Sequence, residues 1–474
     1  MLTDNIILNE TILMVCAYMF ARSIVNKTWA FLVIAVVGVA QAMYALLQCC
    51  GFVEGGHVIF DITGFMGNPG QLGGFQAIAL MSLLVIYEKG RNRHEKVIWA
   101  LSVTLILSSL VLADSRAATL ASVVGVIVLT YQHWVGFMGR YKWMWAVVIC
   151  VILIILFLLY WYRPDSANSR LLIWRVCVDM FADRPLLGFG TGGFNKNYMS
   201  YLSKFLSTHP DHVLSSYAAD TSYPYNEFIH ILIDYGLIGF MLFVAFVVCT
   251  IKGATKKRVI APFVTFLTFA LFSYPSYKLA LAFLFPLLSG VSCSPPVSVS
   301  KRRAVTVLSF AIIGICSANL LYGRYKFKNI VNEIYTGEAT AENIDFVNRF
   351  FKKNHAILSV NTMYATLITH GMYSFSEQNI PLIFPSSDSW CAIGNYYLGK
   401  GEYAIAERYF SQASQMNPLL VKPKYFLWNI YILQNREEEA VILANDILHL
   451  KVKVENTYTL RIKSEMRKYL SKTI

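Results

Sequence analysis

The sequence predicts an all-α polytopic membrane protein of about ten transmembrane helices with one large external loop, followed by a soluble α-helical repeat domain. Of its 474 residues, 56% are hydrophobic and only 15% are charged, whereas an ordinary soluble domain has roughly 25% charged residues. Long apolar runs separated by basic clusters fill residues 1–322, the predicted transmembrane domain. From about Gly323 the runs stop, and amphipathic helical periodicity continues through residues 323–474, the predicted soluble domain.

The apolar runs themselves predict the membrane helices, because a span needs about 20 mainly apolar residues. The windows that meet this condition are 6–21, 28–48, 70–87, 97–113, 118–137, 143–161, 227–251, 259–274, 278–295 and 304–322. The first window has neither a basic stretch before it nor a small-residue cleavage site, so we expect a retained anchor.

Basic residues indicate the orientation of these helices. Lys and Arg gather in every second predicted connection: Arg22 with Lys27; Lys89, Arg91, Arg93 and Lys96; Arg140 with Lys142; Lys252, Lys256, Lys257 and Arg258; and Lys301, Arg302 and Arg303. The positive-inside rule places these connections in the cytoplasm, and therefore both termini and the loop 162–226 outside. In a bacterial inner membrane the soluble domain would then be periplasmic. Because the net charge of +13 is concentrated in membrane loops, we do not expect nucleic acid as a partner.

The soluble domain contains a repeat signature. A series of residues matches the tetratricopeptide (TPR) pattern, with Ile393 in place of Leu: Trp390, Ile393, Gly394, Tyr397, Ala406, Phe410, Ala413 and Pro418. A weaker unit follows with Leu427, Tyr431 and Ala440, and residues 347–373 form a degenerate earlier candidate. Such helix pairs provide a binding surface, so we expect a protein partner or an acceptor here and no chemistry of the domain's own. The alternative, that the domain only caps the membrane part, stays open.

The external loop 162–226 is the expected place of function. Connections longer than about 15 residues are usually functional or disordered, and this one is too rich in aromatic residues for disorder. Its glycines at 188, 190, 192 and 193 superficially suggest a phosphate-binding loop, but no strand precedes them and no Gly-Lys-Ser/Thr follows. We therefore expect them to turn the backbone between two short helices. The nine cysteines show no metal-binding spacing, and no cofactor or metal is expected.

Several short motifs follow one another in and before this loop. They are Gly67-Asn68-Pro69, Asp114-Ser115-Arg116, Ser169-Arg170 with Trp174-Arg175, the glycine-rich stretch from Pro185 to Phe194, and Tyr225-Asn226-Glu227 followed by Gly236-Leu237-Ile238-Gly239. Together, over roughly residues 60 to 245, they resemble the O-antigen ligase and polymerase superfamily, some members of which also carry a TPR region. The resemblance implies transfer of a glycan from a polyprenyl-pyrophosphate carrier to a lipid, glycan or protein acceptor, without metal or nucleotide.

Three arginines fit this chemistry. A pyrophosphate leaving group gains negative charge as the glycosidic bond breaks, and a planar guanidinium with a permanent charge stabilises it. Arg116 lies between two apolar spans, where an unpaired charge is costly, while Arg170 and Arg175 fall where the family's loop arginines occur. The alternatives are a plain charge beside Asp114 for Arg116, and surface salt bridges for the other two. The expected substrate-binding residues are Asn68, Trp174, Tyr225 and Asn226.

The identity of the base is left open by the sequence. The acceptor hydroxyl must lose a proton, and the family's ligases place a His where this chain has Tyr225, a poor base with a pKa near 10. Glu227 or His230 then takes the role, or base catalysis contributes little. With Asp234 they form one polar stripe on a helix; the alternatives are a buried, hydrogen-bonded His and a helix-start carboxylate. Further candidates are His209 and His212.

Four functions compete. The first is a glycan ligase, and the second is a polymerase whose acceptor is itself a lipid-linked repeat unit. A transporter of lipid-linked sugars would carry charged residues at the midplane of many helices and broken helices in inverted repeats, whereas the polar residues here concentrate in one loop. The fourth is a non-catalytic membrane scaffold that presents the soluble domain to partners.

Overall fold

A computed structural model describes residues 5–55, 60–87, 92–140, 163–254, 257–293, 299–369, 376–450 and 457–473, together with a few single residues between these ranges. Every regular element in the described ranges is a helix, as predicted.

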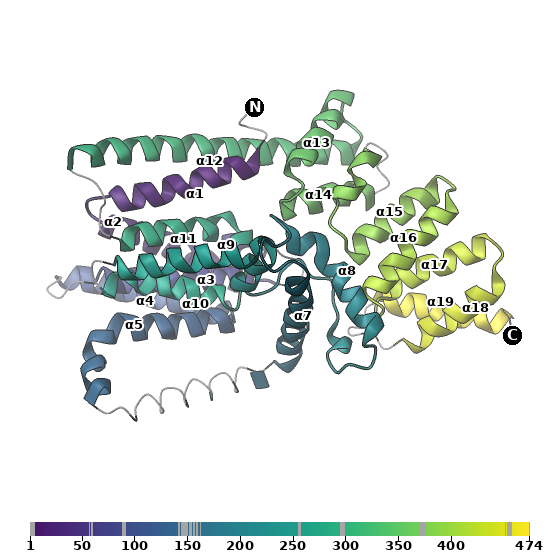
Figure 1. Ribbon diagram of the computed structural model, residues 1–474, viewed down its shortest axis with the longest axis horizontal. Coiled ribbons are helices and arrows are strands. Elements are labelled where there is room, and N and C mark those ends of the chain that lie inside the picture. Colours follow the sequence, from purple (N-terminus) through teal and green to yellow (C-terminus); the bar gives the residue numbers. More distant parts are fainter. Residues whose placement is uncertain are drawn as a thin grey trace.

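In the described part of the chain, nine α-helices form a bundle of roughly parallel and antiparallel rods (Figure 1). They are α1 (Ile6–Ser23), α2 (Thr28–Cys49), α3 (Pro69–Val85), α4 (Arg93–Leu112), α5 (Arg116–Arg140), α9 (Glu227–Lys252), α10 (Ala261–Ala270), α11 (Leu279–Ser292) and α12 (Val299–Thr336). Short 3-10 helices connect some of them: η1 (Gly64–Met66), η3 (Lys257–Ile260) and η4 (Pro275–Tyr277).

The bundle has the composition of a membrane domain. Five of its helices are long and apolar enough to cross a bilayer: Ile6–Ser23, Thr28–Cys49, Arg93–Leu112, Glu227–Lys252 and Lys301–Thr336. Three apolar helices are shorter: Pro69–Val85, Arg258–Ala270 and Leu279–Ser292. A helix therefore occupies each predicted window except 143–161, most of which lies outside the described residues. The total of about ten spans stays a prediction.

Asparagine side chains begin four of these helices. Asn5, Asn68, Asn92 and Asn226 accept hydrogen bonds from first-turn amides of α1, α3, α4 and α9. Such caps satisfy amide groups that have no partner within the helix, and they fix where each helix starts.

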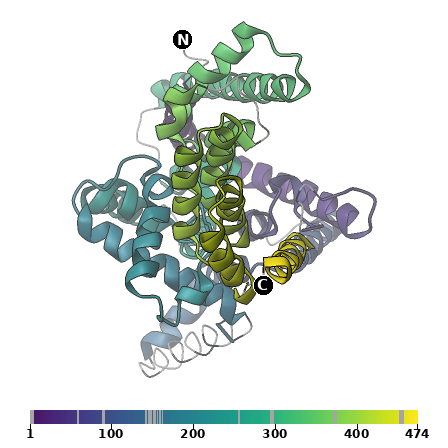
Figure 2. The ribbon, with the colours of Figure 1, turned by 90° about the vertical axis from the view of Figure 1, so that its right-hand side faces the viewer.

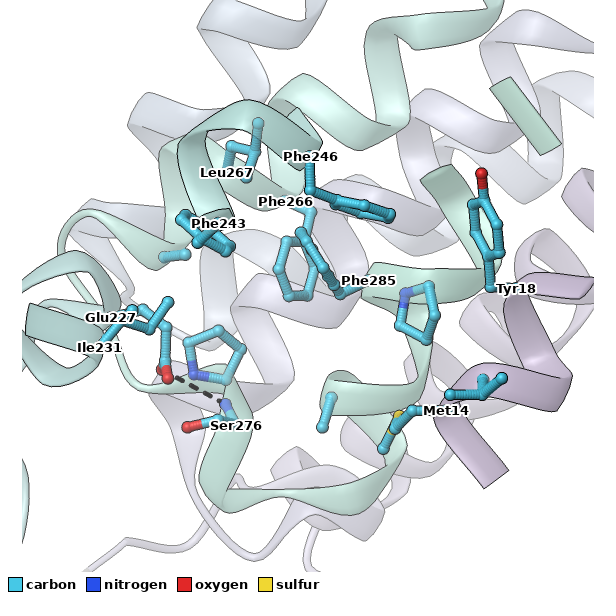
Figure 3. A pocket seen from close by; sticks show the side chains of 15 residues that line it. Met14, Tyr18, Glu227, Ile231, Phe243, Phe246, Phe266, Leu267, Ser276 and Phe285 are labelled. Carbon is cyan, nitrogen blue, oxygen red and sulfur yellow. Dashed lines mark hydrogen bonds between the residues drawn. The ribbon is translucent and has the colours of Figure 1, made fainter. Parts of the chain in front are cut away.

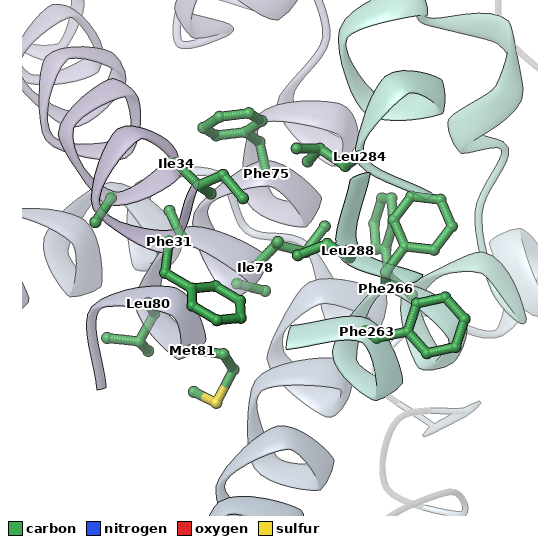
Figure 4. Close-up of a cluster of buried hydrophobic side chains, with 14 of the residues drawn as sticks. Phe31, Ile34, Phe75, Ile78, Leu80, Met81, Phe263, Phe266, Leu284 and Leu288 are labelled. Atoms are coloured by element: carbon green, nitrogen blue, oxygen red, sulfur yellow. The ribbon is translucent and has the colours of Figure 1, made fainter. Parts of the chain in front are cut away.

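Helix α3 lies at the centre of the bundle, and every residue from Gln71 to Leu83 is buried. Figure 4 shows its side chains meeting those of α2, α10 and α11. Small residues permit the close approach: a Cβ at Gly74 would lie 2.3 Å from the Phe269 ring, and one at Gly38 would lie 2.4 Å from the Ala79 Cβ. Because lipid is as apolar as such a core, close packing at small residues is what holds membrane helices together.

The predicted external loop is folded at one end of the bundle. It contains α7 (Pro164–Asp183), α8 (Gly193–Thr208) and η2 (Ser215–Tyr217). The two α-helices bury one face each against the other, with Val176, Met180, Phe194 and Leu202 at the centre of their shared core. The loop is thus a small helical layer, with the glycine-rich turn between two helices as predicted.

The C-terminal helices lie at the same end (Figures 1 and 2). They are α13 (Ala341–Asn354), α14 (Leu358–Thr369), η5 (Glu377–Leu382), α15 (Ser387–Gly399), α16 (Tyr403–Met416), α17 (Val421–Leu433), α18 (Glu437–His449) and α19 (Thr457–Thr473). Helix α12 leads into them without a break at Gly323, so the change in composition there coincides with no change in secondary structure. The domain division at residue 323 stays a prediction.

The helix pair α15 and α16 explains the repeat signature. Phe410, Ala406 and Ala413 are fully buried, and a Cβ at Gly394 would lie 2.4 Å from the Phe410 ring. The small residue and the ring therefore interlock the two helices. Their assignment to the TPR class stays a prediction.

Candidate active site

Two predicted arginines converge on one cavity where the bundle meets the loop layer. Arg116 begins α5, Arg170 lies on α7, and both line a cavity of ≈ 170 Å³ whose other walls are largely apolar: Ala117, Leu120, Tyr160, Ala167, Leu171, Trp174 and Phe272. Arg116 Nη2 donates to Ser166 Oγ at 3.0 Å, and Arg170 Nη1 donates to the Phe272 carbonyl at 3.2 Å. We call this the cationic cavity.

Arg170 sits in an environment that disfavours its charge. Burial, and second to it the neighbouring Arg116, lower the pKa of the Arg170 guanidinium, which nevertheless stays charged at neutral pH. Tyr225 offsets part of this through its ring, which lies 5.1 Å from the guanidinium carbon. Among the described residues, no carboxylate lies within ion-pair distance of Arg170. An anionic ligand would relieve this arrangement.

Both turns that carry the site are strained. Asp114 and Tyr225 have φ of 44° and 53°, values that are uncommon for residues other than glycine. Asp114 also pairs with Arg163, whose segment precedes α7. Such strain persists only where the surroundings enforce it, and it gathers at functional sites.

Trp174 and Arg175 are adjacent in sequence but differ in surroundings. Trp174 lines the cationic cavity and donates from Nε1 to the Pro224 carbonyl at 2.8 Å. Arg175 lies about 140° from Arg170 around an ideal helix; it pairs with Asp179 at 2.6 Å and stacks on Phe205. The structure thus brings Trp174 to the arginine pair and gives Arg175 the contacts of a half-exposed structural ion pair. Its catalytic role stays a prediction.

The predicted polar stripe of α9 is a hydrogen-bonded network. His230 Nδ1 lies 2.9 Å from Glu227 Oε1, and His230 Nε2 lies 3.4 Å from Asp234 Oδ2. The Tyr277 hydroxyl is 3.3 Å from His230 Nε2 and donates to Asn195 Oδ1 at 2.9 Å. Both imidazole nitrogens are therefore occupied by protein groups.

The glycine-rich turn is locked onto α9 by backbone contacts. Asp234 accepts from the amides of Gly192 and Phe194 at 2.9 Å each, which caps α8. Helix α9 is interrupted at Gly236, where φ is 63°, and a Cβ there would lie 2.3 Å from the Leu186 carbonyl oxygen. At Gly188 the φ is 68°, and a Cβ would lie 2.5 Å from the Ile233 carbonyl oxygen. The glycines thus permit two backbones to touch.

Four tyrosines connect the arginine pair to the α9 network. Tyr225 lies under Arg170, Tyr223 stacks on Tyr274 with ring centroids 4.0 Å apart, and Tyr277 stacks on His230 at 5.1 Å. Burial raises the pKa of Tyr225, although Arg170 opposes the shift. Tyr225 is therefore a neutral hydrogen-bond donor at pH 7 and no better a base than the sequence indicates.

A second cavity, ≈ 440 Å³ in volume, adjoins Glu227 (Figure 3). Its walls come from α1, α9, α10, η4 and α11 and are almost entirely apolar: Met14, Val15, Tyr18, Ile231, Phe243, Phe246, Phe266, Leu267, Ala270, Pro275, Ser276, Ala282, Phe285 and Pro286. Figure 3 shows Glu227 at one end, where its Oε2 accepts from the Ser276 amide at 3.4 Å. Glu227 is thus a carboxylate at the end of an apolar space.

The remaining predicted residues have local structural contacts. Asn68 and Asn226 cap α3 and α9, as described above. His209 and His212 follow α8, where His209 contacts Thr208 Oγ1 at 2.8 Å and His212 Nδ1 accepts from the Leu214 amide at 3.1 Å. In the part of the chain that the structure describes, no cluster of His, Cys, Asp and Glu suitable for a metal ion was found. Substrate contacts of the two asparagines stay predictions.

The C-terminal helices touch the loop layer directly. Asp220 accepts from the Ser387 amide at 2.8 Å and from its hydroxyl at 3.0 Å. Met416 is buried in the core of α7 and α8, and Trp390 packs against it. Burial raises the pKa of Asp220, while the bonds from Ser387 lower it. The start of α15 is therefore anchored on the segment that leads to Tyr225.

Sequence reasoning missed several of these groups. Asn195, Asp220 and Tyr277 enter the site from segments far apart in the sequence, and none belongs to a recognisable motif. The one available signal was the aromatic content of the turn at Pro275–Tyr277, which the orientation argument places outside.

Residues 100–244 match a family model described as O-antigen ligase. The matched segment includes Arg116, Arg170, Glu227 and the glycine-rich turn. A search of curated proteins found no match, and neither did a search of solved structures. The match supports the O-antigen ligase superfamily, and with the candidate membrane spans it indicates a membrane protein with a glycan-joining function of the ligase or polymerase type.

Proposed function

We propose that this protein transfers a glycan from a polyprenyl-pyrophosphate carrier to an acceptor on the periplasmic face of the bacterial inner membrane. The observation that carries the proposal is the convergence of Arg116 and Arg170 on one cavity with apolar walls. Two cations side by side repel each other, and burial adds to the unfavourable energy. A diphosphate would neutralise both, while the apolar walls suit the first isoprene units of its lipid.

The arginines would act on the leaving group. In the transfer step the acceptor oxygen bonds to the anomeric carbon, the bond from that carbon to the diphosphate oxygen breaks, and its electron pair leaves with the diphosphate. Guanidinium groups already placed at that oxygen stabilise the developing charge without reorganising. Asn68, Trp174, Tyr225 and Asn226 would position the substrate, and Arg175 would contribute from a greater distance.

We assign the role of general base, which takes the proton of the acceptor hydroxyl, to Glu227. Both nitrogens of His230 are engaged by Glu227, Asp234 and Tyr277, so the imidazole is placed to orient its neighbours. Glu227 instead lines the apolar cavity, where an acceptor hydroxyl could reach it. His230 then positions the carboxylate, and Glu227 takes the acceptor proton.

The apolar cavity favours an acceptor that is itself carried on a lipid. Its walls offer little besides Glu227 and Ser276 to a polar molecule, whereas an acyl or polyprenyl chain would fill it. Both the ligase, with a lipid acceptor, and the polymerase, with a lipid-linked repeat unit, meet this condition. The ligase is our first choice and the polymerase the alternative.

The loop layer, the C-terminal helices and the start of α1 lie at the same end of the bundle, which supports a periplasmic location of the site. The loop layer and the soluble helices lie at one end of the bundle (Figure 1), and the Ile6 amide at the start of α1 donates to Asn354 of α13 at 2.9 Å. The N-terminus, the site and the soluble domain therefore share one side, which the basic clusters mark as external. The soluble domain would present an acceptor or a protein partner there.

The test is transfer by the purified full-length chain in vesicles that contain extracted lipid-linked glycan and candidate acceptors. We expect a joined product with wild-type protein and about a hundredfold or greater loss of rate with Arg116→Ala. Equal protein levels and an equal thermal unfolding midpoint would serve as controls. Movement of the lipid-linked glycan across the vesicle without any joined product would instead favour a transporter.

A further inference from the structure

A third cavity opens beside the arginine pair and differs from the other two in chemistry. It has a volume of ≈ 270 Å³ and lies among α7, α8 and the segment from η2 to Tyr225. Its lining combines hydroxyl groups, aromatic rings and one charge of each sign: Ser166, Ser169, Arg170, Leu172, Ile173, Tyr198, Tyr217, Ala219, Asp220, Thr221 and Tyr225. We call it the polar chamber.

The polar chamber and the cationic cavity share a wall. Arg170 lines both. Ser166, which lines the chamber, accepts the hydrogen bond from Arg116 at 3.0 Å. The two cavities are therefore adjacent, and Arg170 lies between them.

The lining suits a neutral molecule with many hydroxyl groups. A sugar ring offers hydroxyls that both donate and accept hydrogen bonds. The Ser, Thr and Tyr hydroxyls can do the same, and the carboxylate can accept. It also offers C–H faces, for which the rings of Tyr217 and Tyr225 provide an apolar surface. The volume is below the roughly 300–1,000 Å³ of pockets that enclose drug-sized ligands, which limits the chamber to about one sugar residue.

We propose that the polar chamber is the subsite for the sugar residue attached to the diphosphate, so that it selects the donor by its first sugar. This inference rests on the proposed function, because it takes the diphosphate to lie at Arg116 and Arg170. Tyr217 is the specificity-determining residue, and Asp220 holds its segment in place through Ser387.

Asp220 has a place suited to this supporting role. It accepts two hydrogen bonds from Ser387 at the start of α15, and the side chain still lines the chamber. A carboxylate has about four lone-pair sites, so contact with the soluble domain leaves acceptor capacity for a sugar hydroxyl. The soluble domain thereby forms an outer support of the chamber.

The experiment measures binding of four lipids by the purified full-length chain. They are bare polyprenyl diphosphate and the same lipid carrying one hexose, one N-acetylhexosamine or one deoxyhexose. We expect wild-type protein to bind at least one sugar-bearing lipid about fivefold or more tightly than the bare lipid, as one or two added hydrogen bonds would give. Tyr217→Ala should remove that preference and leave binding of the bare lipid unchanged.

Two controls separate this inference from the proposed function. Arg116→Ala should weaken binding of all four lipids, and Tyr403→Ala on α16, where the tyrosine is exposed, should change none. If no sugar adds affinity, or if Tyr217→Ala leaves the preference intact, the chamber is no sugar subsite although the diphosphate site stands. If the bare lipid binds without dependence on Arg116, the proposed function itself is wrong. Tyr217→Phe, which keeps the ring, guards against a folding defect of the alanine variant.

Discussion

Two charged groups lie at the same end of the helical bundle and differ in how their charges are compensated. The α9 network places His230 between Glu227 and Asp234, so each carboxylate has an imidazole nitrogen as a neighbour. The arginine pair places Arg170 beside Arg116, and the pKa of Arg170 is lowered by burial and by that neighbour. The imidazole of the α9 network faces two carboxylates, whereas no carboxylate of the described residues lies within ion-pair distance of Arg170, so Arg170 gains most from an added anion.

This difference indicates which charged group binds the ligand and which one stabilises the structure around it. A buried charge with a partner contributes to structure, and its removal leaves the partner uncompensated. A pair of like charges disfavours the folded protein and persists where a ligand requires it. On this basis the arginine pair is the diphosphate site, and most of the α9 network positions its surroundings. Glu227 belongs to both groups, because it contacts His230 and also lines the apolar cavity.

The strongest test of the comparison is Arg170→Ala. Removing one preorganised donor to a developing anion costs about 10²–10³-fold in rate, and we expect the upper end because Arg170 lines two cavities. The measurement is the rate of joined product in vesicles at saturating acceptor. The thermal unfolding midpoint should be no lower than that of wild type, because the substitution removes the repulsion from Arg116.

Arg170→Lys is the matched variant for this prediction. It keeps the charge and loses the planar fork that contacts two phosphate oxygens, so we expect an intermediate rate. A rate for Arg170→Ala within threefold of wild type would show that the arginine pair does not stabilise the leaving group.

Glu227→Gln tests the one member of the α9 network that we assign to chemistry. The amide retains an oxygen for the Ser276 amide but cannot accept the acceptor proton, and loss of a general base lowers rates by about 10²-fold or more. Binding of bare polyprenyl diphosphate should be unchanged. A greater loss with His230→Gln than with Glu227→Gln would transfer the role of base to the histidine.

The sequence alone predicted the helical class, the loop position and the α9 stripe, because each depends on local patterns. Apolar windows fix helices, and the spacing of Glu227, His230 and Asp234 fixes one helix face. The sharing of Arg170 between two cavities depends instead on the long-range contacts of α7 with Arg116 and Phe272, which no local pattern encodes. The same holds for Asp220, whose partner Ser387 lies 167 positions away in the sequence.

The glycine-rich turn shows a further limit of sequence reasoning. Its pattern predicted a turn between helices correctly, but the reason for several glycines became evident only from the break in α9. At Gly188 and Gly236 two backbone segments approach closely. Each position tolerates only glycine, because a Cβ there would clash with the backbone of the other segment. One motif is therefore spaced to fit another that lies more than forty residues later.

The smallest effect on the transfer rate is expected for a substitution of Asp234, which tests whether the α9 network is only structural. Its two oxygens accept from the Gly192 and Phe194 amides, and the residue is 2% exposed. Asp234→Asn would turn its NH₂ group toward one of these amides and leave a buried donor without an acceptor, at about 1–3 kcal/mol. We expect a lower thermal unfolding midpoint in detergent and, below that midpoint, a transfer rate within a few-fold of wild type. If Asp234→Asn instead unfolds like wild type and transfers nothing, the α9 network acts on the substrate, and the division between a binding pair and a supporting network does not hold.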